Sequence, residues 1–282
     1  MNPTDVDRLI KIALKEDAAD HDLTCIATIE EGLQGEAQIT AKAAGRLSGI
    51  TLASAVFEQV DPAIEQNWLV ADGDAVKPGT LLCKLKGSVH SLLAAERTAL
   101  NFLQHLSGIA TATSRFTEAL TGTSCQVVDT RKTTPGLRIA EKGAVVHGGG
   151  SNHRMDLQSG MLIKENHIEA CGSITDAVGK CYALSDSTWV EVECETFEQL
   201  EEAIHACPNI ILLDNMTPSE VAKAREITPT SILLEASGNI TLENARSYAE
   251  TGVDRIAIGA ITHSAPALDL SMRVTSGESG TP

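Results

Sequence analysis

The sequence predicts an α/β protein whose second half is an incomplete or irregular barrel, preceded by a separate α/β layer. Three observations support this fold class. After residue 125, short apolar segments alternate with amphipathic helical segments. The first hundred residues instead contain strand-like segments separated by glycine-containing turns, and a long amphipathic helix over residues 89–113 joins the two parts. Because repeated βα units produce parallel strands, a doubly wound open sheet remains the alternative to a barrel.

Six segments of the second half have the nearly continuous apolar character of strands in a buried parallel sheet. Two of the helical segments between them have recognisable starts. Thr196 and Gln199 have the spacing of a capping box, and Thr217 precedes Pro218 at a first helical position. The six predicted strands occupy residues 126–130, 161–165, 189–193, 210–215, 231–236 and 255–260.

The N-terminal layer is predicted from two strand-like segments at residues 35–50 and 79–87, of which the second follows a Pro-Gly turn. These segments lack the repeating βα pattern of the second half and therefore indicate a domain of their own. The expected division is an N-terminal α/β domain at residues 1–108, an α/β barrel domain at 109–268, and a C-terminal segment at 269–282 that packs on the N-terminal domain.

The long helix over residues 89–113 has one apolar stripe and one polar stripe. Arg97, Asn101 and Gln104 share the polar stripe, which on spacing alone is ordinarily a solvated face. The residues expected to be buried recur at spacings of three and four: Leu92, Ala95, Ala99, Leu103 and Leu106.

Composition excludes several classes of protein. The formal net charge of −16 disfavours general nucleic-acid binding, which needs a broad basic face. The N-terminus mixes acidic with apolar residues, and no segment has the apolar length of a membrane span, so we expect a soluble, cytoplasmic protein without a membrane partner. The seven cysteines contain no CxxC pair, which makes a disulfide framework or a zinc site improbable.

Functional side chains are expected where the predicted strands end, because α/β barrels and open α/β sheets bind ligands at the carboxyl ends of their strands. Charged or glycine-containing stretches follow every predicted strand. One such residue would be weak support, but the whole set indicates a site. The candidates are Arg131 and Lys132, Lys164, Glu193, Asp214, Ser237 and Gly238, and Gly259 and Ala260.

Between residues 131 and 167 the basic residues outnumber the acidic ones, although the chain as a whole is acidic. Such a cationic region attracts and orients an anion, and arginine binds carboxylate or phosphate through two parallel hydrogen bonds. In the stretch "HGGGSNHR", His153 and Arg154 follow within four residues of three glycines at 148–150. The bare backbone amides of these glycines would allow close approach to an anion.

Glu193 and Asp214 need another explanation, because carboxylates repel an anionic ligand. Two uses fit: holding a Mg²⁺ ion that bridges pyrophosphate oxygens, or stabilising positive charge that develops during a reaction. Structural ion pairs with Lys132 and Lys164 are the plainer alternative and exclude neither use.

Taken together, these motifs resemble the quinolinate phosphoribosyltransferases, also called nicotinate-nucleotide pyrophosphorylases (carboxylating). The resemblance runs from about Glu16 to Arg273 and keeps the order of the motifs. It rests on "ERTALNFLQHLSGIATAT", "DTRKTTPGLR", "GGGSNHR", "LIKENHI", "VEVE", "LLDNM", "EASGNIT" and "GAITHSAPALDLSMR".

The resemblance implies an N-terminal α/β open sandwich domain followed by an irregular, TIM-like α/β barrel. It also implies a homodimer whose active sites take residues from both subunits, with further assembly left open. The implied reaction joins quinolinate to phosphoribosyl pyrophosphate (PRPP) with Mg²⁺ and releases pyrophosphate and CO₂. Its product is nicotinate mononucleotide, on the route of de novo NAD biosynthesis.

Roles also follow from the resemblance, residue by residue. Arg97 is expected to enter the site from the partner subunit and bind a carboxylate of quinolinate. The expected pocket for this dicarboxylate is completed by Arg131, His153, Arg154 and Lys164. Lys132 and Lys164 are expected near PRPP, Glu193 and Asp214 near its ribose and the metal, and Ser237, Gly238, Gly259 and Ala260 around its 5′-phosphate.

Two departures from the family pattern concern loops. Gln158, Ser159 and Gly160 stand where many relatives carry "LSD", and Asn239 stands where a glycine is frequent, although asparagine tolerates left-handed backbone angles. The alternative function is a paralogous phosphoribosyltransferase of the same fold with a different anionic acceptor. A non-catalytic sensor of phosphoribosyl ligands is a third reading, but it would have no use for Glu193 and Asp214 at strand ends.

Overall fold

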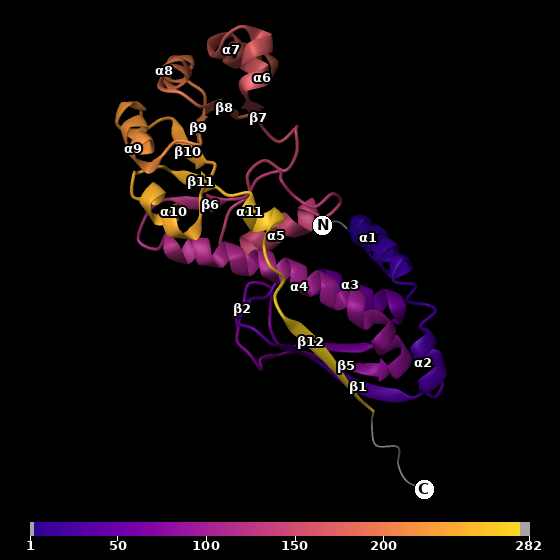
Figure 1. The fold of residues 1–282 in the computed structure, drawn as a ribbon. Helices are drawn as coiled ribbons and strands as arrows, with labels where there is room; N and C mark the ends of the chain where they lie inside the picture. The colour runs from indigo at the N-terminus through magenta and orange to yellow at the C-terminus, as the bar shows by residue number, and fades with distance from the viewer. Residues whose placement is uncertain (1–2, 277–282) are drawn as a thin grey trace. The chain divides into compact units, whose positions relative to one another are not determined.

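The computed structural model describes residues 3–276 (Figure 1). The chain forms two compact units, and each takes more than one stretch of the sequence. Among the described residues, the first unit consists of residues 3–112, 135–149 and 265–276, and the second of residues 113–134 and 150–264.

The first unit contains an antiparallel sheet of four strands in the order β12-β1-β5-β3. In β1 buried and exposed residues alternate, as in a strand with one face on a core and one in solvent. Two short strands, β2 and β4, pair separately. The strands are β1 (Gln34–Ala41), β2 (Gly45–Arg46), β3 (Glu65–Trp68), β4 (Ala75–Val76), β5 (Leu81–Ser88) and β12 (Leu270–Ser276).

The last described strand, β12, returns to the beginning of the chain. It runs antiparallel to β1, so that Leu270 is paired with Ala41 and Val274 with Ala37 (Figure 1). The backbone hydrogen bonds of β1 are thereby used on both sides, by β12 and β5. Residues 277–282 of the predicted C-terminal segment lie outside the described residues.

Five helices belong wholly or mainly to the first unit. The longest of them has its predicted apolar stripe buried, since all five residues predicted to form it are at most 3% exposed. Arg97, on its polar stripe, is exposed. The helices are α1 (Pro3–Glu16), α2 (Leu23–Thr28), α3 (Ile50–Val60), α4 (Val89–Ala119) and α5 (Arg138–His147).

Helix α5 belongs to the first unit, whereas the predicted boundary at residue 108 assigned it to the second. The reason is a polar contact far apart in sequence. The buried Glu141 carboxylate of α5 lies 2.8 Å from His105 Nε2 of α4, and the neighbouring Lys142 is fully buried as well. Glu141 and Lys142 thus lie on the buried face of α5 although both are charged. A hydrophobic pattern therefore does not reveal which unit this helix packs in.

The second unit contains a parallel sheet of six strands in the order β6-β11-β10-β9-β8-β7. All six strands predicted from the sequence are present. Neighbours in the sheet are neighbours in sequence, except that the first strand lies beside the last. This order is that of a barrel and not of a doubly wound sheet, which reverses its strand order at a switch point. The strands are β6 (Gln126–Val128), β7 (Met161–Ile163), β8 (Val190–Cys194), β9 (Ile210–Asp214), β10 (Leu233–Ser237) and β11 (Arg255–Ala257).

Within the described chain, β6 and β7 form the two edges of this sheet, in agreement with the predicted incomplete barrel. Helices follow the strands, and the predicted helix starts are confirmed. Thr196 accepts a hydrogen bond from the Gln199 amide, and Thr217 forms a complete capping box with Glu220. The helices of this unit are α6 (Glu165–Cys171), α7 (Ile174–Leu184), α8 (Phe197–Ala206), α9 (Pro218–Ile227), α10 (Leu242–Ala249) and α11 (Ala260–His263).

Candidate active site

A cavity of about 410 Å³ lies at the carboxyl ends of the parallel strands of the second unit. It brings together eight of the residues predicted from strand ends and motifs. The parallel register explains why, since Asp214 is paired with Ser237 and Glu193 with Leu212. The lining residues are Thr130, Arg131, Lys132, His153, Arg154, Leu162, Lys164, Glu193, Leu212, Asp214, Glu235, Ser237 and Ala257.

Lys164 and Glu193 form an ion pair in this cavity. The Lys164 side chain, directly after β7, is 42% exposed, whereas the Glu193 side chain at the end of β8 is only 10% exposed. Burial raises the pKa of the Glu193 carboxyl, the Lys164 ammonium offsets part of this rise, and the nearby Asp214 adds to it. The sequence left a structural ion pair of Glu193 with a lysine as the alternative to a catalytic use. This ion pair is present, and both of its residues line the cavity with the other predicted site residues.

Lys132 lies in the loop after β6, and its backbone carbonyl is hydrogen-bonded to a residue of the short helix α11. The Thr262 hydroxyl donates a hydrogen bond of 2.8 Å to the Lys132 carbonyl. A Cβ atom at Gly259 would lie 3.1 Å from Lys132 Cδ. A larger residue at 259 would therefore displace the lysine, so Gly259 acts on the site through its neighbour. Neither Gly259 nor Ala260 is among the residues that line the cavity.

The loop after β10 is fixed by two residues with left-handed backbone angles. Gly238 has φ of +89° and Asn239 has φ of 54°. The Asn239 side chain donates a hydrogen bond of 3.0 Å to Asn215 Oδ1. The asparagine that departs from the family pattern thus adopts the angle that a glycine would, and ties this loop to the loop after β9.

Replacing Gly238 by alanine is expected to raise the KM for the phosphorylated substrate and to destabilise the protein. Its Cβ would lie only 2.1 Å from Asn215 Oδ1, in a backbone conformation that alanine disfavours. Gly122 is a matched control, because its φ of +87° is nearly the same and nothing lies within 4 Å of its added Cβ. Steady-state kinetics and urea denaturation would test this. Equal effects of both substitutions would mean that the contact with Asn215 is unimportant.

The backbone amides of the first two of the three consecutive glycines are used within the protein. The Gly148 amide donates to the carbonyls of Ala144 and Val145, and the Gly149 amide donates to Val146. These amides end helix α5, and they are satisfied by its last turn. The glycines therefore provide a helix end before the chain passes to His153 and Arg154, and the predicted anion contact with Gly148 and Gly149 is wrong.

Arg97 stands apart from the other predicted residues. It belongs to α4 in the first unit, whereas every residue that lines the cavity belongs to the second unit. Its predicted contribution from a partner subunit stays a prediction.

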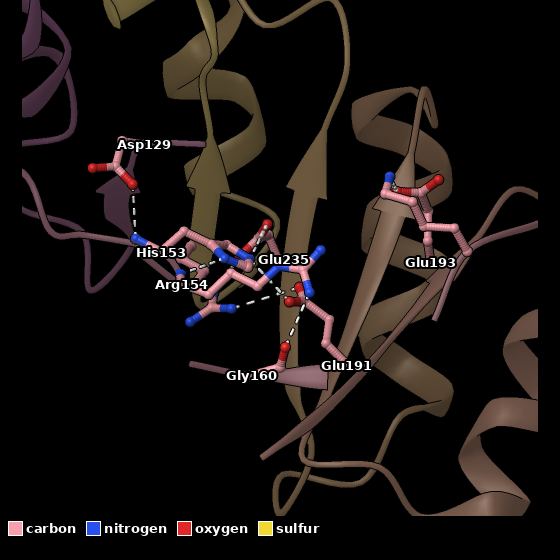
Figure 2. Close-up of polar contacts among 9 residues, drawn as sticks. Asp129, His153, Arg154, Gly160, Glu191, Glu193 and Glu235 are labelled. Atoms are coloured by element: carbon pink, nitrogen blue, oxygen red, sulfur yellow. Dashed lines mark hydrogen bonds and ion pairs between the residues drawn. The ribbon is translucent and has the colours of Figure 1, made fainter. Parts of the chain in front are cut away.

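A buried polar network forms part of the cavity wall, which His153 and Glu235 line (Figure 2). The residues of this network that strand ends and motifs did not predict are Glu191, Glu235 and Arg255. Glu191 and Glu235 are 0% exposed inside strands β8 and β10, and Arg255 pairs with both of them. His153 lies 2.9 Å from Glu191 and 3.6 Å from Glu235. The available signal was a glutamate in the middle of each apolar segment, in "VEVE" and in "LLEAS", because a buried carboxylate needs a partner.

Two sets of side chains have ligand atoms of the kind that hold a metal ion. His153, Glu191 and Glu235 have ligand atoms within 4.8 Å of one another, but the Arg255 guanidinium pairs with both carboxylates and opposes a cation there. Glu193 and Asp214 suit Mg²⁺ better. They line the open cavity, they offer hard oxygen ligands, and Mg²⁺ is ordinarily held by one or two carboxylates together with substrate phosphates.

The fold and the cavity together define the class of protein. Four cationic side chains, Arg131, Lys132, Arg154 and Lys164, line one cavity with two carboxylates at the carboxyl ends of a barrel-like sheet. This arrangement belongs to enzymes of anionic substrates. Among residues 3–276 no helix combines the length and apolar character that a membrane span requires.

The chain belongs to the quinolinate phosphoribosyltransferase family. Residues 22–107 match the N-terminal domain of the quinolinate phosphoribosyl transferases, and residues 109–273 match their C-terminal domain. The family is one of phosphoribosyltransferases that decarboxylate their acceptor, as the names of its members state.

Individual relatives are similar over nearly their whole length. A probable nicotinate-nucleotide pyrophosphorylase (carboxylating) of Bacillus subtilis is 42% identical over 98% of this chain and 95% of its own. The chloroplastic enzyme of that name from Arabidopsis thaliana is 40% identical over 97% of this chain and 84% of its own. The structure of nicotinate-nucleotide pyrophosphorylase from Francisella tularensis superimposes with a TM-score of 0.94, at 40% identity and 98% coverage of both chains.

Proposed function

We propose that this chain transfers the phosphoribosyl group of PRPP to quinolinate, with release of pyrophosphate and CO₂, in de novo NAD biosynthesis. The observation that carries the proposal is the cavity in which four cations meet the strand-end carboxylates Glu193 and Asp214, with Glu235 also in its wall. A dicarboxylate and a pyrophosphate ester bound side by side need several cations, which this acidic chain concentrates in one place. The names of the family members agree with this activity.

The cations are assigned to the two substrates by their chemistry. Arg131 and Arg154 bind the carboxylates of quinolinate, because a guanidinium offers two parallel donors to a carboxylate. Lys132 and Lys164 act as point charges for the PRPP phosphates. Ser237 donates its hydroxyl to the 5′-phosphate at the loop after β10, in the manner of phosphate sites in late barrel loops.

The reaction begins with attack of the pyridine nitrogen on the anomeric carbon. The nitrogen–carbon bond forms while the bond from that carbon to the pyrophosphate oxygen breaks, and pyrophosphate takes the electron pair. Glu193 and Asp214 stabilise the positive charge on the ribose, and Lys132 and Lys164 stabilise the charge on the departing pyrophosphate. The 2-carboxylate then leaves as CO₂, because the adjacent cationic nitrogen stabilises the resulting carbanion, which takes a proton.

Mg²⁺ is part of the proposal. Glu193 and Asp214 would hold it together with substrate phosphates, and the ion would neutralise charge on the pyrophosphate. Because Lys164 already pairs with Glu193, the lysine has a second use: it limits the repulsion between the two neighbouring carboxylates when the metal is absent.

The decisive assay supplies the purified protein with quinolinate labelled in its 2-carboxylate, PRPP and Mg²⁺. Labelled CO₂ and nicotinate mononucleotide are expected in equal amounts. A parallel reaction with nicotinate in place of quinolinate serves as control, since it lacks the second carboxylate. Turnover of nicotinate without turnover of quinolinate would instead support the paralogous phosphoribosyltransferase with another acceptor.

A homodimer with shared sites is a further part of the proposal, with Arg97 supplied by the partner. The proposal also includes a cytoplasmic location and leaves assembly beyond the dimer open. Arg97→Ala and Arg131→Ala are each expected to be nearly inactive alone. Mixed, they should regain about a quarter of the wild-type activity per dimer site, because statistical exchange gives half hybrids and each hybrid has one intact site. Fluorescence transfer between labelled subunits would verify exchange. Complete exchange without regained activity would contradict the shared site.

A further inference from the structure

The loop that begins at Arg154 is closed by the side chain of that arginine. Arg154 Nη1 donates a hydrogen bond of 3.0 Å to the carbonyl of Gly160, which directly precedes β7 (Figure 2). At the tip of the loop, Asp156 Oδ1 accepts hydrogen bonds from the amides of Gln158 and Ser159, at 3.0 and 2.9 Å. The three residues that depart from the family pattern therefore share a structural use, since they close the loop that holds Arg154.

Gly160 has no side chain, and an indole ring occupies the space where one would lie. A Cβ atom at this position would lie 2.2 Å from Cζ2 and 2.4 Å from Cε2 of Trp189. Strand pairing holds the two residues together, because the Met161 amide donates a hydrogen bond of 3.0 Å to the Trp189 carbonyl. An aromatic ring placed over a glycine of a neighbouring edge strand covers the bare backbone. A larger residue at 160 would displace the ring.

Trp189 also contacts the beginning of the loop. Its ring meets the His153 ring edge to face, with centroids 5.5 Å apart and an angle of 71° between the planes. His153 directly precedes Arg154, and Gly160 provides the oxygen that the Arg154 guanidinium binds. One indole ring thus packs beside both the donor and the acceptor of this hydrogen bond, and it holds them at a fixed separation.

Trp189 lies behind the site and not in it. The described lining of the site cavity does not include Trp189, whereas His153 and Arg154 line both that cavity and a second one of about 370 Å³, which Trp189 lines. The second cavity lies at the amino ends of the strands, because Ile210 and Leu233 in its wall are the first residues of β9 and β10. Trp189 therefore acts on a substrate only through its neighbours.

The Arg154 guanidinium needs support from the protein because it lies near a second cation. Burial, followed by the charge of Arg131, lowers the pKa of Arg154, and Glu191 opposes this effect. Before an anion binds, hydration and the repulsion from Arg131 both favour a guanidinium that turns away from the site. The hydrogen bond to the Gly160 carbonyl opposes that movement. A guanidinium has five N–H donors, so others remain for a ligand.

We propose that Trp189 and Gly160 are positioning residues for the acceptor. By filling the space of a side chain at 160, the indole holds the Gly160 carbonyl where it orients the Arg154 guanidinium toward an acceptor carboxylate. An arginine that is already ordered loses less conformational entropy when its ligand binds. The identity of the acceptor as quinolinate rests on the proposed function. The arrangement supports binding of the acceptor and not of PRPP.

Kinetics test this role. Gly160→Ala and Trp189→Ala are each expected to raise the KM for quinolinate about tenfold, with kcat and the KM for PRPP changed less than threefold. The first displaces the ring, and the second removes it. The double variant should be no worse than Trp189→Ala alone, because the space left by the ring accepts the added Cβ. Trp189→Phe keeps a ring and should raise this KM less than threefold.

Gly179→Ala is the matched control. Gly179 lies on α7 of the same unit, and nothing lies within 4 Å of a Cβ added there. This variant should have wild-type values of kcat and of both KM values. It separates the contact with the indole from the general effect of replacing a glycine by alanine.

The orientation of Arg154 can also be measured without any substrate. Phenylglyoxal modifies accessible arginines, and mass spectrometry of the digested protein gives the rate at Arg154. In Gly160→Ala and in Trp189→Ala this rate is expected to rise about fivefold, because the guanidinium is released from the Gly160 carbonyl. The rate at Arg8, whose side chain is 76% exposed, serves as the internal reference and should not change.

Two results would overturn the proposal. One is a folded Trp189→Ala protein with an unchanged KM for quinolinate and an unchanged modification rate at Arg154. The other is a double variant in which the two single losses multiply. If Trp189→Ala does not fold, a Gly160→Ala protein with the same KM as Gly179→Ala overturns it instead. If the wild-type protein does not use quinolinate, the proposed function fails, while the modification rates still decide whether Trp189 and Gly160 hold Arg154.

Discussion

Replacing Lys164 by alanine is expected to lower kcat/KM by about 10²–10³-fold. The substitution removes a cation from a cavity that must hold two anionic substrates. It also leaves the Glu193 carboxylate without its ion-pair partner, next to Asp214. The pKa of Glu193, already raised by burial, would rise further, and less of this carboxylate would be ionised to stabilise the ribose cation. Initial rates at varied concentrations of both substrates would measure the loss.

Lys223→Ala is the matched control, because Lys223 is an exposed lysine of the same unit, on α9. It should leave kcat/KM unchanged within a factor of two. A Lys164→Ala protein with near-wild-type kinetics would remove the lysine from the proposed mechanism and reduce the ion pair with Glu193 to a structural contact.

Replacing Arg255 by alanine is expected to cost about 3–5 kcal/mol of unfolding free energy. Arg255 is the guanidinium that pairs with both Glu191 and Glu235, and both carboxylates have no exposed surface. Without it, two buried acids lie close together with no countercharge. Urea denaturation, with the unfolding free energy extrapolated to water, measures the loss. Arg8→Ala is the control: its ion pair with Asp5 is exposed on the arginine side and should contribute less than 1 kcal/mol.

The loss caused by Arg255→Ala should also grow with pH. The folded-state pKa of Glu235 is raised above its usual value, so its favourable contribution is fully present below pH 4.5 and is lost as the pH rises through the folded pKa. Arg255 lowers that pKa, and its removal extends the unfavourable range upward. A larger loss at pH 8 than at pH 5 is therefore expected. An equal loss at both values would mean that the packing of the arginine, and not its charge, stabilises the layer.

The sequence was sufficient for the repeating half of the fold and for the composition of the cavity. The parallel strands are mostly apolar and are followed by charged or glycine-containing stretches, and parallel strands bring their carboxyl ends to one edge. Lys164, Glu193 and Asp214 were therefore found without any structure. The boundary between the two units was harder to predict. Helix α5 belongs to the first unit and contacts it through Glu141, a charged residue that hydrophobic periodicity scores as exposed.

By itself the sequence determined where the parallel strands lie along the chain, the edge at which ligands are expected and the family to which the chain belongs, since these depend on local apolar patterns and on motifs. The order of the strands in the sheet, which excludes a doubly wound fold, came from the structure. Only the tertiary structure decided which groups are partners. Glu191, Glu235, Arg255 and His153 come from different strands and loops, and whether a buried carboxylate is paired depends on distances of a few ångströms between them. No spacing along the chain encodes such distances, because hydrogen bonds and ion pairs form between atoms that folding alone brings together.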